Sequence, residues 1–204
     1  MTVIVDYGVG NLFSLKCSLA KIGEEAVISG EKELILSADR IILPGVGAFS
    51  DAAQKLNDTG LADVLREAAD CKIPILGICL GMQLLFDKSF EFGECDGLGL
   101  ISGCVKPIEP RIGGLKVPHM GWNSLDFTNK LSKLYKYISN GDFVYFVHSF
   151  AAEDCDEFVT AYADYGAKIT ASVERDNVYG TQFHPEKSGD VGLKILKAFC
   201  EVKA

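Results

Sequence analysis

Short apolar runs alternate with amphipathic segments in the first half of the chain. Thr2–Val5, Arg40–Leu43 and Ile73–Ile78 are apolar with little polar alternation, which is typical of strands that are buried on both faces. Helices are predicted between these strands and after the last of them, at Leu12–Ile22, 48–57, Leu61–Ala69 and Leu80 to about Phe86. The pattern predicts a parallel sheet covered by helices on both faces, an α/β fold.

From about residue 100 the pattern changes to strand-like runs separated by turns. These runs are Leu100–Ile108, Phe143–Phe150, Glu157–Ala163, Lys168–Glu174 and Asn177–Phe183. They indicate an antiparallel extension or a mixed part of the same sheet, followed by a helix at 191–201. Because no repeat, low-complexity tract or linker interrupts the pattern, we expect one domain over residues 1–204.

Composition narrows the class of protein. A net charge of −8 without a cluster of Lys and Arg argues against nucleic-acid binding. The most apolar stretch, Ile73–Phe86, is too short to span a membrane and contains Pro74 and Gln83. The seven cysteines include no C-x-x-C pair, which favours free thiols in a reducing compartment. We therefore expect a cytoplasmic protein that needs no metal and no cofactor.

Glycines flank one cysteine in the segment Gly77-Ile78-Cys79-Leu80-Gly81. A nucleophile on a sharp strand-to-helix turn needs small neighbours, and the start of a helix favours a thiolate there. The Leu80 N–H is then a candidate donor to an oxyanion. Most cysteines are simply buried apolar groups, but the two glycines favour a nucleophile at Cys79.

A second candidate segment is Gln182-Phe183-His184-Pro185-Glu186. Pro185 keeps the preceding residue extended, so His184 and Glu186 are expected to project to one side. A carboxylate beside a histidine can orient it as a general base. Alone, the segment is as compatible with a surface turn; together with Cys79 it predicts a Cys-His-Glu triad.

These two segments resemble the class I (triad) glutamine amidotransferases. The resemblance covers Gly77 to Gln83 and His184-Pro185-Glu186. It implies a three-layer, flavodoxin-like fold with a mostly parallel central sheet and an antiparallel extension. It also implies a γ-glutamyl thioester on Cys79, release of ammonia, and a substrate-binding role for Gln83.

Five further segments are similar to the glutaminase subunits of imidazole glycerol phosphate synthases. They are Asp6 to Asn11, Pro44 to Gly47, Val117 to Asn123, Val147 to Ser149 and His184 to Ser188. This resemblance implies a (β/α)8-barrel cyclase as partner in a heterodimer, acting in histidine biosynthesis. The residue roles that it implies are an oxyanion donor at Val46 or Gly47, glutamine contacts at Ser149 and Phe150, and a partner interface at Asn11, Trp122 and Lys187.

Some assignments stay open at this level. A lone tryptophan such as Trp122 is usually a core residue, and Lys187 is as compatible with a solvated surface position. His119 and His148 are expected to be hydrogen-bonded structural histidines. Phe150 stands where these subunits often carry tyrosine. Alternative functions are the glutaminase subunit of pyridoxal phosphate, anthranilate or purine synthesis, a stress or chaperone-like protein with a cysteine elbow, and a catalytically silent scaffold.

Overall fold

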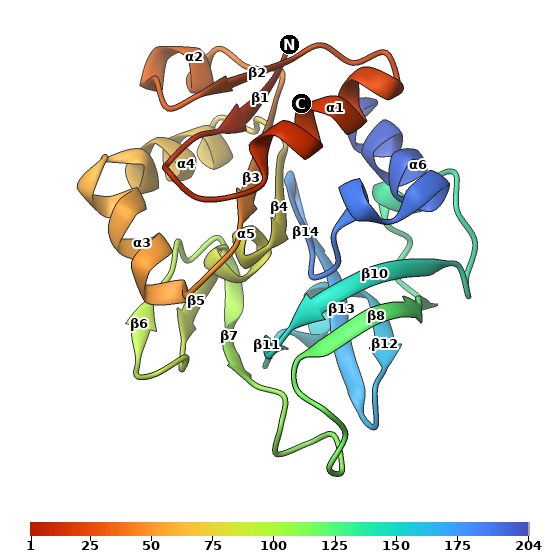
Figure 1. The fold of residues 1–204 in the computed structure, drawn as a ribbon. Coiled ribbons are helices and arrows are strands. Elements are labelled where there is room, and N and C mark those ends of the chain that lie inside the picture. Colours follow the sequence, from red (N-terminus) through yellow and green to blue (C-terminus); the bar gives the residue numbers. More distant parts are fainter. Residues whose placement is uncertain (204) are drawn as a thin grey trace.

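A mostly parallel sheet forms the centre of the molecule (Figure 1), described by a computed structural model that covers residues 1–203. Among these residues the order of its strands is β2-β1-β3-β4-β14-β13-β12-β9. Their bounds are β1 Thr2–Val5, β2 Ala26–Ser29, β3 Arg40–Gly45, β4 Ile75–Cys79, β9 Asp126–Phe127, β12 Val159–Asp164, β13 Lys168–Arg175 and β14 Val178–Thr181. The pairs from β2 to β14 are parallel and those from β14 to β9 are antiparallel. The predicted α/β fold with an antiparallel extension is confirmed.

Helices cover both faces of this sheet (Figure 1). Their bounds are α1 Leu12–Lys21, α2 Lys32–Leu36, α3 Phe49–Asp58, α4 Leu61–Asp70, α5 Leu80–Leu84 and α6 Gly189–Cys200, with short 3-10 turns η1 Lys133–Tyr135, η2 Asp156–Phe158 and η3 Pro185–Lys187. Helices α2, α3 and α4 contribute to one buried cluster, and α1 and α6 to the other.

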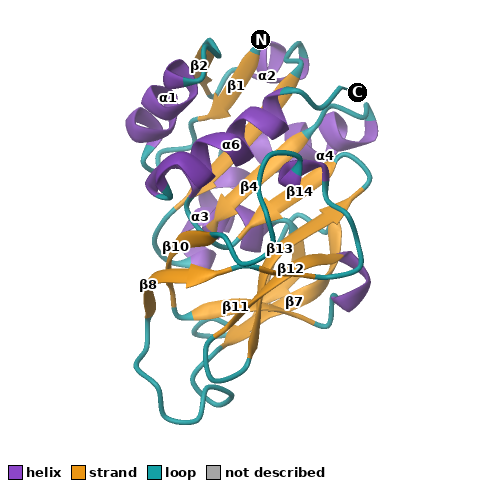
Figure 2. Cartoon of the chain, turned by 90° about the vertical axis from the view of Figure 1, so that its right-hand side faces the viewer, coloured by secondary structure: helices purple, strands orange, loops and turns teal. Residues whose placement is uncertain are grey.

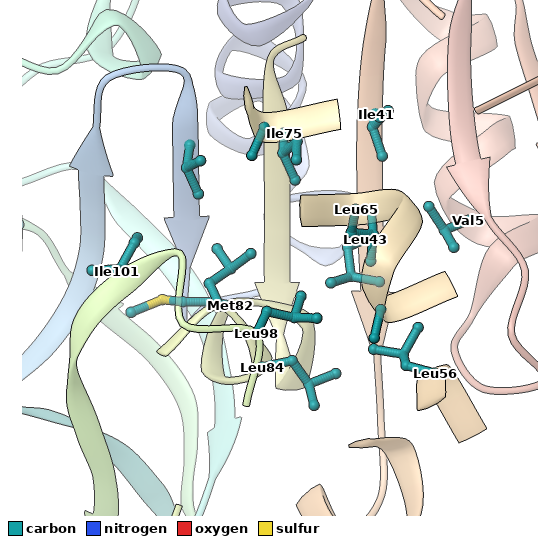
Figure 3. Close-up of a cluster of buried hydrophobic side chains, with 14 of the residues drawn as sticks. Val5, Ile41, Leu43, Leu56, Leu65, Ile75, Met82, Leu84, Leu98 and Ile101 are labelled. Atoms are coloured by element: carbon teal, nitrogen blue, oxygen red, sulfur yellow. The ribbon is translucent and has the colours of Figure 1, made fainter. Parts of the chain in front are cut away.

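The alternation of side chains along a strand explains the unbroken apolar runs. In β3, Ile41 and Leu43 point into the cluster under α3 and α4, whereas Ile42 belongs to the cluster under α1 and α6. Figure 3 shows Ile41 and Leu43 beside Leu56 of α3 and Leu65 of α4. Both faces of the strand are buried, which favours apolar residues at all three positions.

Two of the predicted strands do not join the central sheet. Leu100–Ile108 contains β7 (Ile101–Pro107), which belongs to a separate four-stranded sheet of order β11-β7-β5-β6. Phe143–Phe150 divides at Ser149 into β10 (Phe143–His148) and the start of β11 (Phe150–Glu153). Before Ser149 the chain pairs with β8 (His119–Ser124), and after it with β7 (Figure 2). The apolar pattern predicts that a segment is a strand but does not indicate which strand it pairs with. This explains why the two segments were assigned to the wrong sheet.

The helix that follows Cys79 is shorter than predicted. It ends at Leu84 instead of about Phe86, and Phe86 begins β5 (Phe86–Ser89), which pairs with the two-residue β6 (Cys95–Asp96). The short elements β2 and α2 were also not predicted. No helix in the described part of the chain is both long and apolar enough to cross a membrane.

Candidate active site

Cys79 lies at the sharp turn from β4 into α5, at the carboxyl end of a strand between β3 and β14. Its φ of 55° and ψ of −111° are strained for a residue other than glycine. A Cβ atom on Gly81 would overlap the Leu43 carbonyl oxygen, and one on Gly77 would lie 2.6 Å from the Gly81 carbonyl oxygen. The close approach therefore requires both glycines, as the elbow pattern predicted.

The main-chain N–H of Leu80 is the first of α5, where a helix provides no acceptor of its own. Leu80 lies beside Cys79 in the wall of the same pocket. Because α5 has only five residues, its dipole is short, and the free N–H groups of its first turn are its main electrostatic contribution.

His184 and Glu186 form a buried pair. Nδ1 of His184 lies 2.8 Å from Oε1 of Glu186, and the two side chains are 4% and 5% exposed. The predicted extended segment is wrong, because His184 is extended but Pro185–Lys187 forms a 3-10 turn. Proline fits the first position of a helical turn while it keeps the residue before it extended. The turn, rather than strand alternation, brings Glu186 back to the imidazole.

The main chain around His184 is anchored on both sides. Its N–H donates to the Tyr145 carbonyl oxygen at 2.9 Å, and the Ser188 hydroxyl donates to its carbonyl oxygen at 2.7 Å. The main chain of His184 is thus fixed by contacts outside the pocket, and the bond to Glu186 orients its ring.

The charge on His184 depends on its two neighbours. Burial of the ring opposes the charged form, but the interactions with Cys79 and Glu186 outweigh it and raise the pKa of His184 to about 9. At neutral pH an imidazolium is therefore favoured when Cys79 is a thiolate. A thiolate–imidazolium pair is the state in which a cysteine is nucleophilic.

A pocket of about 420 Å³ opens beside the Cys79 sulfur. It brings together most of the site residues predicted from the sequence, namely Val46, Gly47, Cys79, Leu80, Gln83, Ser149, Phe150, His184 and Lys187. Glu186 and Asn11 do not line this pocket; they line a second, smaller cavity, and His184 lines both cavities. Asn11 also caps α1 by accepting from the Ser14 N–H. Within residues 1–203, Oε2 of Glu186 has no hydrogen-bond partner.

Gln83 is buried rather than an exposed helix position, with 5% of its surface accessible. Its Nε2 donates to the Phe150 carbonyl oxygen and to Oε1 of Gln182, each at 3.0 Å. Nε2 of Gln182 in turn lies 3.7 Å from the Cys79 sulfur. Since an amide nitrogen carries two hydrogens, only Oε1 of Gln83 is left to accept from a ligand.

Trp122 is not a core residue, because it is 55% exposed on β8. Its indole meets the Tyr145 ring edge-on at a centroid distance of 6.2 Å. Nζ of the exposed Lys187 lies 6.0 Å from the centroid of the same ring. Trp122 and Lys187, predicted separately from the sequence, therefore share one aromatic neighbour, and Lys187 also lines the pocket.

Several pocket residues were missed in the sequence. Glu91, Phe92 and Pro118 line the pocket. Glu91 accepts a hydrogen bond of 2.7 Å from the Phe49 N–H, and burial raises its pKa despite that bond. The charged residue between two phenylalanines in Phe90-Glu91-Phe92 was the available signal, but no spacing rule connects it to Cys79.

The chain belongs to the class-I glutamine amidotransferases, whose family model matches residues 3–202. Within that class it belongs to the family of the imidazole glycerol phosphate synthase subunit HisH. It is 50% identical to the HisH subunit of Lactococcus lactis over 98% of this chain and 97% of that protein. It is 49% identical to the HisH subunit of Wolinella succinogenes, over 99% of this chain and 100% of that protein.

Solved structures support the fold. A crystal structure of a glutamine amidotransferase superposes with a TM-score of 0.74 at 20% identity, covering 97% of this chain and 98% of that one. PurLQS from Thermotoga maritima gives a TM-score of 0.72 at 22% identity, covering 98% of this chain and 96% of the other. At these identities the likeness is one of fold.

Proposed function

We propose that this chain hydrolyses glutamine to glutamate and ammonia and supplies the ammonia to a cyclase subunit of imidazole glycerol phosphate synthase. The observation that carries the proposal is the meeting of Cys79 and His184 in one pocket, with Glu186 bonded to the far nitrogen of the imidazole. The identity of about 50% to HisH subunits supports the choice of this synthase.

In the proposed mechanism the Cys79 thiolate attacks the γ-carboxamide carbon of glutamine. The carbonyl π electrons move to oxygen, and the tetrahedral intermediate collapses as His184 gives its proton to the leaving nitrogen, which departs as ammonia. Water, deprotonated by His184, then cleaves the thioester to glutamate and regenerates the thiolate. Glu186 keeps the proton of Nδ1 in place and stabilises the imidazolium.

Two main-chain donors are proposed for the oxyanion. One is the Leu80 N–H, and the second comes from Val46 or Gly47, which line the pocket at the end of β3. Gly47 has a φ of +99°, a conformation that side chains disfavour, so the peptide beside it has freedom to rotate. Rotation of that peptide is a simple way to switch the glutaminase on when a partner binds.

Recognition of the amino-acid end of glutamine needs a carboxylate and main-chain donors. Glu91 is the only acidic side chain among the described residues that line the pocket, and we assign it to the α-ammonium group. The main chain of Ser149 and Phe150, which also line the pocket, is proposed to contact the substrate, with Gln83 supporting the Phe150 carbonyl.

The partner is proposed to be a (β/α)8-barrel cyclase that forms a heterodimer with this chain. It joins the ammonia to a phosphorylated ribulosyl formimino carboxamide and yields imidazole glycerol phosphate and aminoimidazole carboxamide ribotide, in the cytoplasm. Asn11, Trp122 and Lys187 are proposed to face this partner. Residues 1–204 are proposed to act as one glutaminase domain without metal or cofactor, with residue 204 outside the described part.

Other amidotransferases are less favoured. Relatives that are 45–50% identical over nearly the whole chain are HisH subunits. A stress or chaperone-like protein has no use for the His184–Glu186 pair beside the cysteine.

The test is a glutaminase assay of the purified chain. The chain is assayed alone and together with the cyclase subunit of an imidazole glycerol phosphate synthase and the nucleotide ligand of that cyclase. The free chain should hydrolyse glutamine slowly, and the complex should be faster. Cys79→Ser should abolish hydrolysis but leave product formation from added ammonium salt, because a serine hydroxyl is far harder to ionise. Glutaminase activity retained in that variant would exclude Cys79, and stimulation by another synthase instead would redirect the assignment.

A further inference from the structure

Two buried histidines outside the triad are joined in a line of hydrogen bonds that ends at the pocket. Nδ1 of His119 lies 3.0 Å from Nε2 of His148, and Nδ1 of His148 lies 2.9 Å from the Phe150 carbonyl oxygen. At the other end, Nδ2 of Asn123 lies 3.3 Å from Nε2 of His119. Both histidines are hydrogen-bonded, as the sequence predicted. In addition, all the hydrogen bonds of this series run from donor to acceptor in the same direction.

The direction follows from the groups at its ends. A carbonyl oxygen only accepts, so His148 carries its proton on Nδ1 and, when neutral, accepts at Nε2. His119 must then donate from Nδ1 and accept at Nε2, and Asn123 must supply the donor. Every bond therefore points from Asn123 toward Phe150, and both rings are the same neutral tautomer.

Contacts of Asn123 fix that end independently. Its Nδ2 also donates to the Asp164 carbonyl oxygen at 2.8 Å, and its Oδ1 accepts from the Ser124 N–H at 2.8 Å. These two bonds place Nδ2 of Asn123, rather than Oδ1, toward His119, as the series of hydrogen bonds requires. The amide cannot turn over without losing both of these bonds.

At the pocket end, the series reaches the point where the chain leaves one sheet for another. His148 ends β10 and Phe150 begins β11, and both residues line the pocket. The Phe150 carbonyl oxygen accepts from His148 and from Gln83, so both of its lone pairs are used. The wall of the pocket at Ser149 is therefore clamped by its neighbours.

The opposite face of β8 is open. His119 and Asn123 point inward, whereas Met120 and Trp122 between them are 61% and 55% exposed. The His119 ring is stacked between Phe146 and Tyr165, at centroid distances of 4.7 and 4.1 Å. A displacement of β8 would therefore carry the imidazole with it.

We propose that Asn123, His119 and His148 are positioning residues for glutamine binding, a relay of neutral side chains that holds the Phe150 carbonyl and ties the pocket wall to β8. The relay touches no reacting atom. It acts through the main chain of Ser149 and Phe150, so the inference rests on the proposed function.

The surroundings keep the relay neutral. Burial lowers the pKa of His119 to about 4. Burial also lowers the pKa of His148 to about 3; the bond to the Phe150 carbonyl opposes this shift, and the electrostatic effects of His119, His184 and Arg111 add to it. Tyr165 stacks on His119, and Asp164 contacts Asn123 only through its main chain. Between pH 6 and 8.5 the wild-type relay should not titrate.

The variant N123D reverses one end of the relay, because a carboxylate cannot donate to Nε2 of His119. The new carboxylate favours the charged imidazolium and so raises the pKa of His119 from its low wild-type value. The relay reforms only when His119 takes a second proton and donates from both nitrogens, so it is intact at low pH and lost as the pH rises. In the complex with the cyclase subunit, we expect the KM for glutamine of N123D to rise about tenfold between pH 6 and 8.5, with a small change in kcat. The wild-type KM should stay level.

N140D is the matched control. Asn140 is exposed, and its only side-chain hydrogen bond within residues 1–203 is the one it accepts from the Phe127 N–H. A carboxylate can therefore replace it, and the KM should follow the wild type. A KM for N123D equal to that of N140D at every pH would overturn the proposal. A wild-type complex that does not hydrolyse glutamine would instead overturn the proposed function.

A measurement on the unmodified chain tests the relay without activity or mutation. The protein has three histidines, so their ¹⁵N side-chain resonances can be resolved in the full-length protein. His119 and His148 should both be neutral with the proton on Nδ1 from pH 6 to 8.5. A proton on Nε2 of His148, or a charged His119 in this range, would refute the relay even if N123D had the expected KM.

Discussion

The Tyr7 hydroxyl donates a hydrogen bond of 2.8 Å to the carbonyl oxygen of Pro44, at the end of β3. Tyr7 is 4% exposed, and burial together with the nearby Cys79 raises the pKa of its phenol, which therefore remains a neutral donor. The peptides of Gly45, Val46 and Gly47 follow directly after this anchor. Tyr7 thus marks the boundary between the rigid strand and the segment that is proposed to supply an oxyanion donor.

Tyr7→Phe should leave the Pro44 carbonyl without this donor. We expect a loss of roughly 1 kcal/mol in the free energy of unfolding, measured with urea. The kcat for glutamine should also change, since the oxyanion segment loses its anchor. Tyr179→Phe is the control, because the buried Tyr179 hydroxyl has no partner within residues 1–203 and its removal should be neutral or stabilising. Equal behaviour of the two variants would refute a role for the Tyr7–Pro44 bond.

His184→Ala and Glu186→Gln should differ in severity. Loss of His184 should lower kcat by about 10²–10⁴-fold, because this residue both gives a proton to the leaving nitrogen and takes one from the attacking water. Glu186→Gln preserves shape and removes charge, so it should be the milder change, with measurable residual activity. Steady-state glutaminase assays of both variants decide this, and a fully active Glu186→Gln would remove the carboxylate from the mechanism.

The His184 pKa of about 9 predicts a pH dependence of stability. Because the folded value lies above the ordinary value near 6.5, the stability that the charged ring contributes is fully present below pH 6.5 and is lost as the pH rises through 9. The difference in free energy of unfolding between wild type and His184→Asn should therefore shrink between pH 6.5 and 9.5. A difference that stays constant across this range would show that the ring is neutral throughout.

Glu91→Gln should weaken substrate binding without impairing the chemistry. The KM for glutamine should rise by about tenfold, since the α-ammonium loses its counter-charge in a partly buried site, while kcat changes little. Glu94→Gln, which affects the exposed partner of Lys88, is the control and should match the wild type. If the KM of Glu91→Gln were normal, the Glu91 carboxylate would serve only to accept the hydrogen bond from the Phe49 N–H.

Lys187→Ala and Trp122→Ala should uncouple ammonia production from its use. Both side chains lie against the Tyr145 ring, and Lys187 lines the pocket. A loosened interface there would let ammonia escape, at a cost of roughly 1–3 kcal/mol of coupling. Alkylation of Cys79 should be normal, while imidazole product per glutamine consumed should fall. Lys32→Ala, which breaks a surface ion pair with Glu67, is the control. An unchanged ratio in both variants would exclude this role.

Much of the fold could be read along the chain, because it depends on local periodicity. The unbroken apolar runs of β1, β3 and β4 reflect burial on both faces of a parallel sheet, and the amphipathic segments between them became α1, α3 and α4. The prediction was wrong about the pairing of later strands. It did not show, for example, that the segment Phe143–Phe150 divides at Ser149 and pairs in two different sheets. Pairing is a relationship between distant segments and leaves no mark on the periodicity of either one.

The elbow at Cys79 and the pairing of His184 with Glu186 could be predicted along the chain, because each depends on neighbours within a few residues: two glycines in the first case and Pro185 in the second. Three other features depend on how distant segments pack: Glu91 enters the pocket, Trp122 is exposed, and His119 and His148 form a directed series of hydrogen bonds. These depend on which segments pack together, and residue type alone does not specify the environment that sets a side chain's burial, tautomer or charge.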